Sequence, residues 1–124
     1  MEKMEILKLT VRPQTFGDIL GGQKEYTREI RPETQEIYCE MDDEGYVVDI
    51  DGVLQPRKYD AIQFVCFRES YTCKVKSAHI ELFKDDDDQL ITYIENGEEY
   101  LAAQIVYELE GPLEEDDDED MVLN

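Results

Sequence analysis

Alternating polar and apolar residues predict a β-strand at the start of the chain, followed by a short helix. In residues 5–11, Leu7, Leu9 and Val11 fall on one face, as apolar residues do in a half-buried strand. Pro13 suits the first turn of a helix, where its missing N–H is not needed, and apolar residues follow it at helical spacing. Gly21 and Gly22 then supply a left-handed stop. We therefore expect one helix of about two turns.

Most of the remaining chain is predicted to be strand. The expected strands cover residues 24–30, 36–41, 46–50, 53–54, 59–67, 71–83, 90–94 and 100–109. Asp51-Gly52 and Asn96-Gly97 are typical central pairs of two-residue hairpin turns. The chain lacks regular strand–helix alternation, so the pattern predicts a mainly β (α+β) fold, a small antiparallel barrel or sandwich with one or two short helices.

Length and composition indicate one soluble domain. The chain has 124 residues, and 41% of them are hydrophobic, enough for a real core. No apolar run approaches the roughly 20 residues that cross a bilayer, and the first residues lack a signal-peptide core. We therefore expect a cytoplasmic protein without a membrane partner. Cys39, Cys66 and Cys73 form neither a disulfide framework nor a zinc motif, so reduced structural cysteines are expected.

Charge is distributed unevenly along the chain. Twelve Lys and Arg stand against 32 Asp and Glu, a net charge of −20. Residues 1–84 contain all the Lys and Arg and half of the acidic residues, whereas residues 85–124 contain the other half of the acidic residues and no Lys or Arg. Because acidic surfaces repel phosphate, any contact with nucleic acid is expected within residues 1–84. Residues 1–111 are expected to form the domain, and residues 112–124 a disordered acidic tail.

One short motif resembles an enzyme loop. Residues 47–54, with Asp49 and Asp51, are similar to the nucleophile loop of haloacid-dehalogenase-type phosphotransferases, in which two aspartates act beside Mg²⁺. The later motifs and crossover helices of that family are missing here. A simple hairpin is therefore the preferred interpretation.

Other catalytic and metal-binding patterns are absent from the sequence. His79 is the sole histidine, and neither serine lies in a small-residue elbow. The run Asp85–Asp88 lacks the spaced ligands of a calcium loop and is expected to be a solvated turn. We expect no metal and no cofactor.

The segment after the helix carries the strongest candidate site. Lys and Arg side chains can hold phosphate or carboxylate, and a nearby tyrosine can stack on a base. The candidate ligand-binding residues are Lys24, Tyr26, Arg28, Arg31, Arg57 and Lys58, with Thr27 as a hydroxyl donor and Arg12 near the same rim. The alternative from residue chemistry alone is an ordinary charged strand face.

The same segment resembles the signature of the ASCH family, small domains similar to the PUA fold. Ile19-Leu20-Gly21-Gly22-Gln23-Lys24 is similar to its first half and Arg28-Glu29-Ile30-Arg31-Pro32 to its second, as in the compact bacterial and phage members. Residues 58–64, 74–83 and 103–107 extend the resemblance. Thr27 stands where the family usually has Glu. The resemblance implies a β-barrel whose cleft accepts a nucleotide, a modified nucleoside or single-stranded RNA.

Two other functions stay open. Some ASCH members resemble amidohydrolases acting on acylated cytidine through Lys-x-x-Thr, a spacing that Lys24 and Thr27 fit. Lys24 would then activate Thr27, with Glu69 or Glu81 as the carboxylate. Alternatively, the acidic C-terminal region docks a basic protein or mimics nucleic acid.

Overall fold

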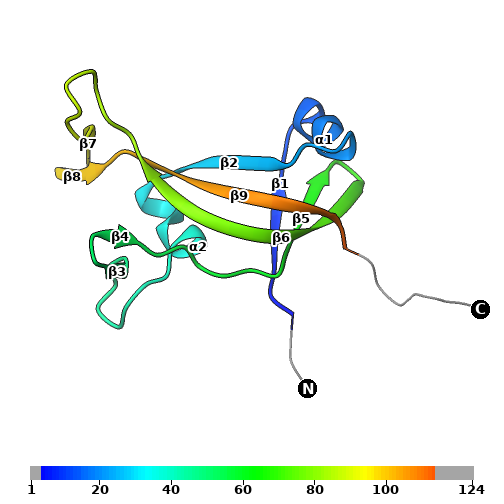
Figure 1. Ribbon diagram of the computed structural model, residues 1–124, viewed down its shortest axis with the longest axis horizontal. Coiled ribbons are helices and arrows are strands. Elements are labelled where there is room, and N and C mark those ends of the chain that lie inside the picture. The colour runs from blue at the N-terminus through cyan, green and yellow to red at the C-terminus, as the bar shows by residue number, and fades with distance from the viewer. Residues whose placement is uncertain (1–3, 114–124) are drawn as a thin grey trace, which may run out of the picture. The chain divides into compact units, whose positions relative to one another are not determined.

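The computed structural model describes residues 4–113, and strands dominate them (Figure 1). The elements are β1 (Ile6–Thr10), α1 (Pro13–Leu20), β2 (Glu25–Ile30), a 3-10 turn η1 (Pro32–Thr34), α2 (Gln35–Tyr38), β3 (Asp49–Ile50), β4 (Val53–Leu54), β5 (Ala61–Cys66), β6 (Glu69–Leu82), β7 (Thr92–Glu95), β8 (Glu98–Leu101) and β9 (Ala103–Pro112). The expectation of a mainly β chain with one or two short helices is confirmed, since the chain has α1 and α2.

Five of the strands form one sheet, in the order β1-β5-β6-β9-β2. β1 pairs with β5 in parallel, whereas β5 with β6 and β2 with β9 are antiparallel. β3–β4 and β7–β8 form separate two-stranded hairpins. Pairing is therefore mainly antiparallel, as predicted, with one parallel pair that the sequence pattern did not indicate.

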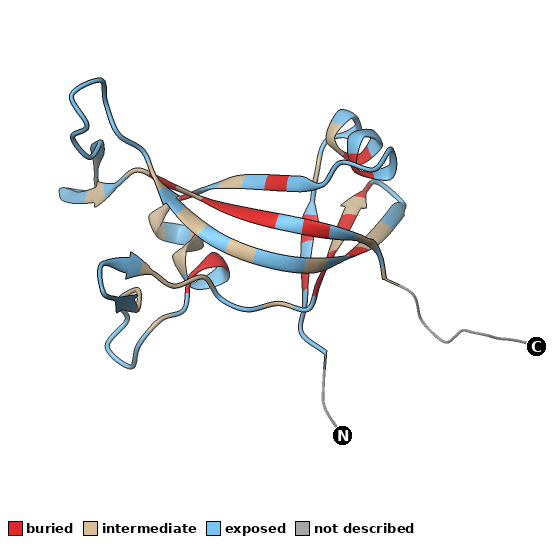
Figure 2. Cartoon of the chain, viewed as in Figure 1, coloured by how far each residue is buried: buried red, intermediate tan, exposed pale blue. Residues whose placement is uncertain are grey.

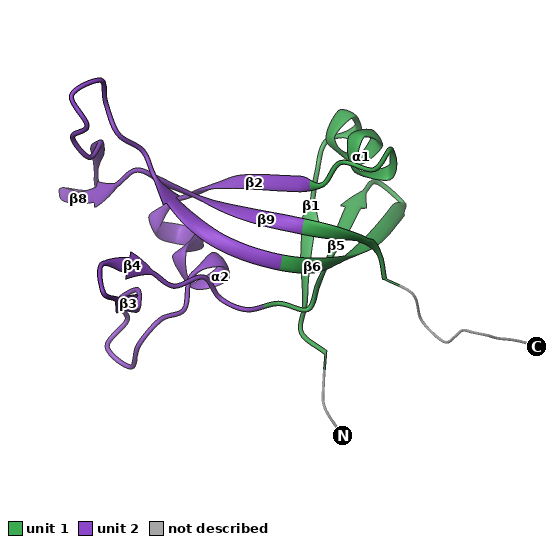
Figure 3. Ribbon diagram, in the orientation of Figure 1, with its two compact units in different colours: residues 1–24, 59–76, 109–124 green, residues 25–58, 77–108 purple. Residues whose placement is uncertain are grey.

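The chain divides into two compact units (Figure 3). Unit 1 comprises residues 1–24, 59–76 and 109–124, and unit 2 comprises residues 25–58 and 77–108. The core of unit 1 lies on one face of β1, β5 and β6, where the register sets Leu7 beside Ile62 and Ile62 beside Cys73. These side chains are buried, as are Phe16 and Ile19 of α1. Alternation in the strands and helical spacing in α1 produce this core.

Unit 2 has its own buried residues. Tyr26 and Ile30 of β2 lie on the same face as their β9 partners Tyr107 and Ala103, and all four are buried (Figure 2). Tyr38 of α2 packs against Tyr107, with ring centroids 6.5 Å apart and planes at 59°. This tilted arrangement is one that aromatic pairs favour.

Both predicted hairpin turns are present. Asp51 and Gly52 have φ of 54° and 80°, and Asn96 and Gly97 have φ of 52° and 82°, so both central residues are left-handed in each turn. That geometry matches the twist of the flanking strands and selects Asx-Gly. Asp49 Oδ1 accepts a hydrogen bond from Gly52 N at 2.8 Å. The haloacid-dehalogenase-like motif is therefore a hairpin, and Asp49 helps to form its turn.

Three predicted strands differ in the structure; of residues 46–50, only Asp49–Ile50 forms a strand, and Val47 makes an isolated bridge. Residues 36–41 were expected to be strand, but η1 and α2 occupy residues 32–38, and only Cys39 and Met41 make isolated bridges. Pro32 starts this helical segment, and the hydroxyl of Thr34 accepts a hydrogen bond from Arg31 N. These local start signals outweigh a weak alternation. The expected strand 100–109 is divided between β8 and β9.

The expected disordered tail lies almost wholly outside the described residues. No helix in residues 4–113 is long and apolar enough to cross a membrane.

Candidate functional site

Lys24 and Thr27, the candidate amidohydrolase pair, lie in different units. Lys24 is an exposed residue of unit 1, and its carbonyl accepts a hydrogen bond from Leu109 N at 2.7 Å. Thr27 is exposed on β2 in unit 2, opposite Val106 of β9. The structure therefore supplies no joint geometry for the two.

The expected role of Tyr26 as a stacking surface requires correction. Its side chain lies on the core-facing side of β2 and is only 6% exposed. Its hydroxyl accepts a hydrogen bond from Nη1 of Arg28 at 2.6 Å. Because successive residues of a strand point to opposite faces, Tyr26 and Arg28 share a face, and Thr27 takes the other. Tyr26 supports Arg28 from within the core and offers no open ring face to a base.

Arg31 is engaged by its own unit. Its guanidinium forms ion pairs with Glu95 at 2.5 Å and Glu29 at 3.3 Å, and its carbon lies 4.5 Å from the centroid of the Tyr93 ring. Partial desolvation opposes its charge, but the interactions with Glu29 and Glu95 outweigh this and raise the Arg31 pKa. Tyr93 stacks in turn on Tyr100, with centroids 5.8 Å apart. Arg31 therefore links β2 to the β7–β8 hairpin.

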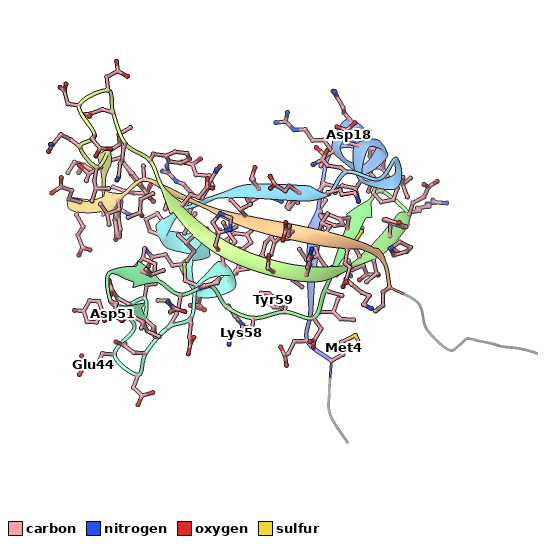
Figure 4. All side chains as sticks on the ribbon, viewed as in Figure 1. Met4, Asp18, Glu44, Asp51, Lys58 and Tyr59 are labelled. Carbon is pink, nitrogen blue, oxygen red and sulfur yellow. The ribbon has the colours of Figure 1, made fainter. Side chains whose placement is uncertain are left out.

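Arg57 and Lys58 differ in their surroundings. Nη1 of Arg57 donates to the carbonyl of Glu36 at 3.1 Å, and its backbone N–H donates to Tyr38 O at 2.9 Å. Arg57 thus closes the end of α2. Lys58, labelled in Figure 4, is exposed on the segment between β4 and β5 and makes no hydrogen bond or ion pair within residues 4–113.

Charge separates sharply between the two units. The described part of unit 1 contains six basic and five acidic residues, whereas unit 2 contains five basic and nineteen acidic residues. Glu44 and Asp51, labelled in Figure 4, belong to the acidic set of unit 2. The bases of unit 1 are all exposed and form no hydrogen bond or ion pair through their side chains with other described residues: Lys8, Arg12, Lys24, Arg68, Lys74 and Lys76.

Three of these bases share one face of the unit 1 sheet, which we call the lysine face. The register places Lys8 in a row with Gln63 and Thr72. Lys74 lies in the adjacent row, opposite Ala61, and Lys76 follows it two residues along β6 on the same face. The unit 1 segments of β1, β5 and β6 place no acidic side chain on this face. The sequence pattern did not indicate the lysine face, because Lys8 and Lys74 come near each other only through the parallel pairing of β1 with β5.

A second feature of unit 1 is a hollow of about 430 Å³ between α1 and the β5–β6 turn. Its lining is mostly apolar and includes Pro13 and Phe16 of α1. Phe67 and Arg68, the two turn residues, line it as well, and the ring of Phe67 is 86% exposed. Sequence reasoning placed Phe67 at the end of a buried strand and so did not single it out.

The remaining titratable groups indicate structural roles. Cys39 is buried, and burial raises the pKa of its thiol to about 11. Glu81 accepts hydrogen bonds from the His79 ring and from Gln104. Both bonds lower the pKa of Glu81, and the bond from His79 has the larger effect. No group of three or more His, Cys, Asp or Glu within residues 4–113 is arranged to hold a metal ion.

Comparison with known proteins returned no match for this chain, neither to a protein-family model nor to a curated protein or a solved structure.

Proposed function

We propose that this chain is a small ASCH-like binding module for single-stranded RNA, a nucleotide or a modified nucleoside, and that unit 1 makes the contact. Phosphate is the group shared by RNA and nucleotides, and Lys and Arg are its usual protein partners. The resemblance of residues 19–32 to the ASCH signature supports this ligand class.

The proposal depends mainly on one observation: most described Lys and Arg side chains of unit 2 contact other protein groups, whereas those of unit 1 do not. In unit 2, Arg31 and Lys84 contact carboxylates, and Arg28 and Arg57 contact a hydroxyl and a backbone carbonyl. Lys58 is the exception among the described bases of unit 2, since it is exposed and has no described partner. In unit 1, all six described bases are exposed and have no described partner, Lys24 among them. An unpaired lysine can exchange its counterion for a phosphate without breaking a protein contact.

The high net negative charge does not prevent such binding. Charges in about 0.1 M salt are screened beyond roughly 10 Å, so a phosphate responds mainly to the side chains nearest to it. The lysine face carries three bases and no acid from its own strands. Weak long-range repulsion from the nineteen acids of unit 2 lowers the association rate, and because salt screens this repulsion, it offsets only part of the affinity that counterion release loses as salt is added.

Fluorescence anisotropy with a labelled single-stranded RNA tests the proposal on the full chain. Lys24→Gln and Lys76→Gln each remove one exposed charge from unit 1, and Lys84→Gln is the matched change in unit 2. We expect the wild type to bind with a negative salt slope, and each unit 1 variant to reduce that slope by about 0.7. Lys84→Gln should bind as the wild type does.

Two outcomes would contradict the proposal. A wild-type chain that binds neither the RNA nor a free nucleotide at low salt has no such function. Equal losses in Lys76→Gln and Lys84→Gln would show a diffuse charge effect with no site in unit 1.

A further inference from the structure

The geometry of unit 1 points to a base-stacking subsite at the β5–β6 turn, in which Phe67 stacks on an unpaired base and Arg68 contacts the adjoining phosphate. This inference rests on the proposed function and names the part of the ligand that the hollow takes.

Phe67 has an unfavourable conformation for its residue type. Cys66 pairs with Glu69, so Phe67 and Arg68 form a two-residue turn, and Phe67 has a φ of 55°. The other non-glycine residues with positive φ in the described chain are Asp51, Asp88 and Asn96. Asp and Asn tolerate this region because their short side chains bond locally, whereas an aromatic residue gains nothing comparable.

Exposure adds a second cost. The Phe67 ring is 86% exposed, so the core gains almost no burial from it. A residue that fits neither its backbone conformation nor its solvent environment is best explained by what it contacts outside the fold. At both hairpin turns built by Asx-Gly, the chain uses the residues that the geometry favours.

The surroundings of Phe67 suit a base with its phosphate. The hollow beside it measures about 430 Å³, within the ordinary range of small-molecule sites of roughly 300–1,000 Å³. Pro13, Phe16 and Cys66 give it an apolar floor, and Figure 1 shows α1 beside the β5–β6 turn. The exposed guanidinium of Arg68 adjoins this floor and has no described partner.

Glu69 also lines the hollow, and its carboxylate favours bases that carry an amino group. A carboxylate repels phosphate but accepts hydrogen bonds from the amino groups of bases, as from N4 of cytosine. Uracil has no amino group. The subsite should therefore prefer cytosine to uracil.

The test compares wild type, Phe67→Asn and Phe67→Tyr in the full chain. The probes are oligocytidylate, oligouridylate and an abasic oligomer of equal length that keeps the phosphates. We expect the wild type to bind oligocytidylate most tightly. Phe67→Asn should lose about tenfold in affinity for oligocytidylate, the size of one stacked base, and bind the abasic oligomer unchanged. Phe67→Tyr keeps the ring and should keep the affinity.

Thermal unfolding separates a ligand role from a structural one. Asn favours a positive φ, so Phe67→Asn should melt at or above the wild-type temperature while binding more weakly. The stacking subsite would be wrong if Phe67→Asn bound oligocytidylate as tightly as the wild type does, or if it lost as much affinity for the abasic oligomer as for oligocytidylate. Neither result would contradict the proposed function. A wild type that binds none of the three probes would overturn both.

Discussion

Replacement of Tyr26 tests whether this residue belongs to the core or to a ligand site. The sequence pattern suggested a stacking surface, but the structure buries the ring to 6% exposure on the core-facing side of β2. The informative pair of variants is Tyr26→Ala, which removes the ring, and Tyr26→Phe, which removes only the hydroxyl.

The expected magnitudes follow from burial and hydrogen bonding. A buried aromatic side chain covers about 150–250 Å², which at about 25 cal/mol per Å² corresponds to an upper bound of about 4–6 kcal/mol. Aromatic-to-Ala changes in cores cost about 3–5 kcal/mol, so we expect about 3–4 kcal/mol for Tyr26→Ala. Tyr26→Phe withdraws the acceptor that Nη1 of Arg28 contacts at 2.6 Å. Because Arg28 is half-buried, we expect about 1.5 kcal/mol for that change.

Urea unfolding followed by circular dichroism measures both effects, since the chain has no tryptophan to serve as a fluorescent probe. With a denaturant slope of about 1.5–2 kcal/mol per molar, Tyr26→Ala should lower the midpoint by about 2 M. RNA binding by Tyr26→Phe should match the wild type. A Tyr26→Ala protein that unfolds at the wild-type midpoint but loses RNA affinity would refute the assignment of this ring to the core.

Three further predictions concern other described contacts. Arg31→Met should speed amide hydrogen exchange in the β7–β8 hairpin without changing RNA affinity, because Arg31 contacts Glu95 and Tyr93; a large loss of affinity would instead make it a ligand residue. Burial raises the Cys39 pKa to about 11 from 9.0, so the unfolded thiol ionises first and stability should fall between pH 9 and 11. Cys39→Ala should lose less stability than the wild type over that range, and an equal loss would contradict this assignment. Gly97→Ala should cost about 1 kcal/mol in urea unfolding, because Gly97 has a φ of 82°, and an unchanged midpoint would contradict the turn geometry.

The sequence predicted the features that depend on short-range rules. The helix begins at Pro13 and ends before Gly21, as its start and stop residues indicated. The Asx-Gly pairs marked both hairpins correctly, since a left-handed pair of residues is a local requirement. Residues 36–41 were mistaken for strand because their alternation is weak and the helix start at Pro32 lies outside that window.

The candidate site was less predictable because cations are engaged or available according to their tertiary neighbours. Arg31 and Lys24 look alike in the sequence, yet Glu95, 64 residues further along, binds Arg31, whereas Lys24 is exposed without a described partner. Strand register decides which lysines share a face, and the sequence pattern did not indicate the parallel β1–β5 pair that brings Lys8 near Lys74. The sequence pattern likewise did not indicate the exposed turn position of Phe67, because that position depends on the pairing of Cys66 with Glu69.

The most direct test of RNA binding through unit 1 is an amide chemical-shift titration of the ¹⁵N-labelled full chain with single-stranded oligocytidylate. We predict that the shifted resonances belong to residues 4–24, 59–76 and 109–113, with the largest shifts near Lys24, Arg68 and Lys76. Resonances of residues 25–58 and 77–108, where acids outnumber bases, should move least. Shifts concentrated in unit 2, or no shifts at low salt, would contradict the proposal.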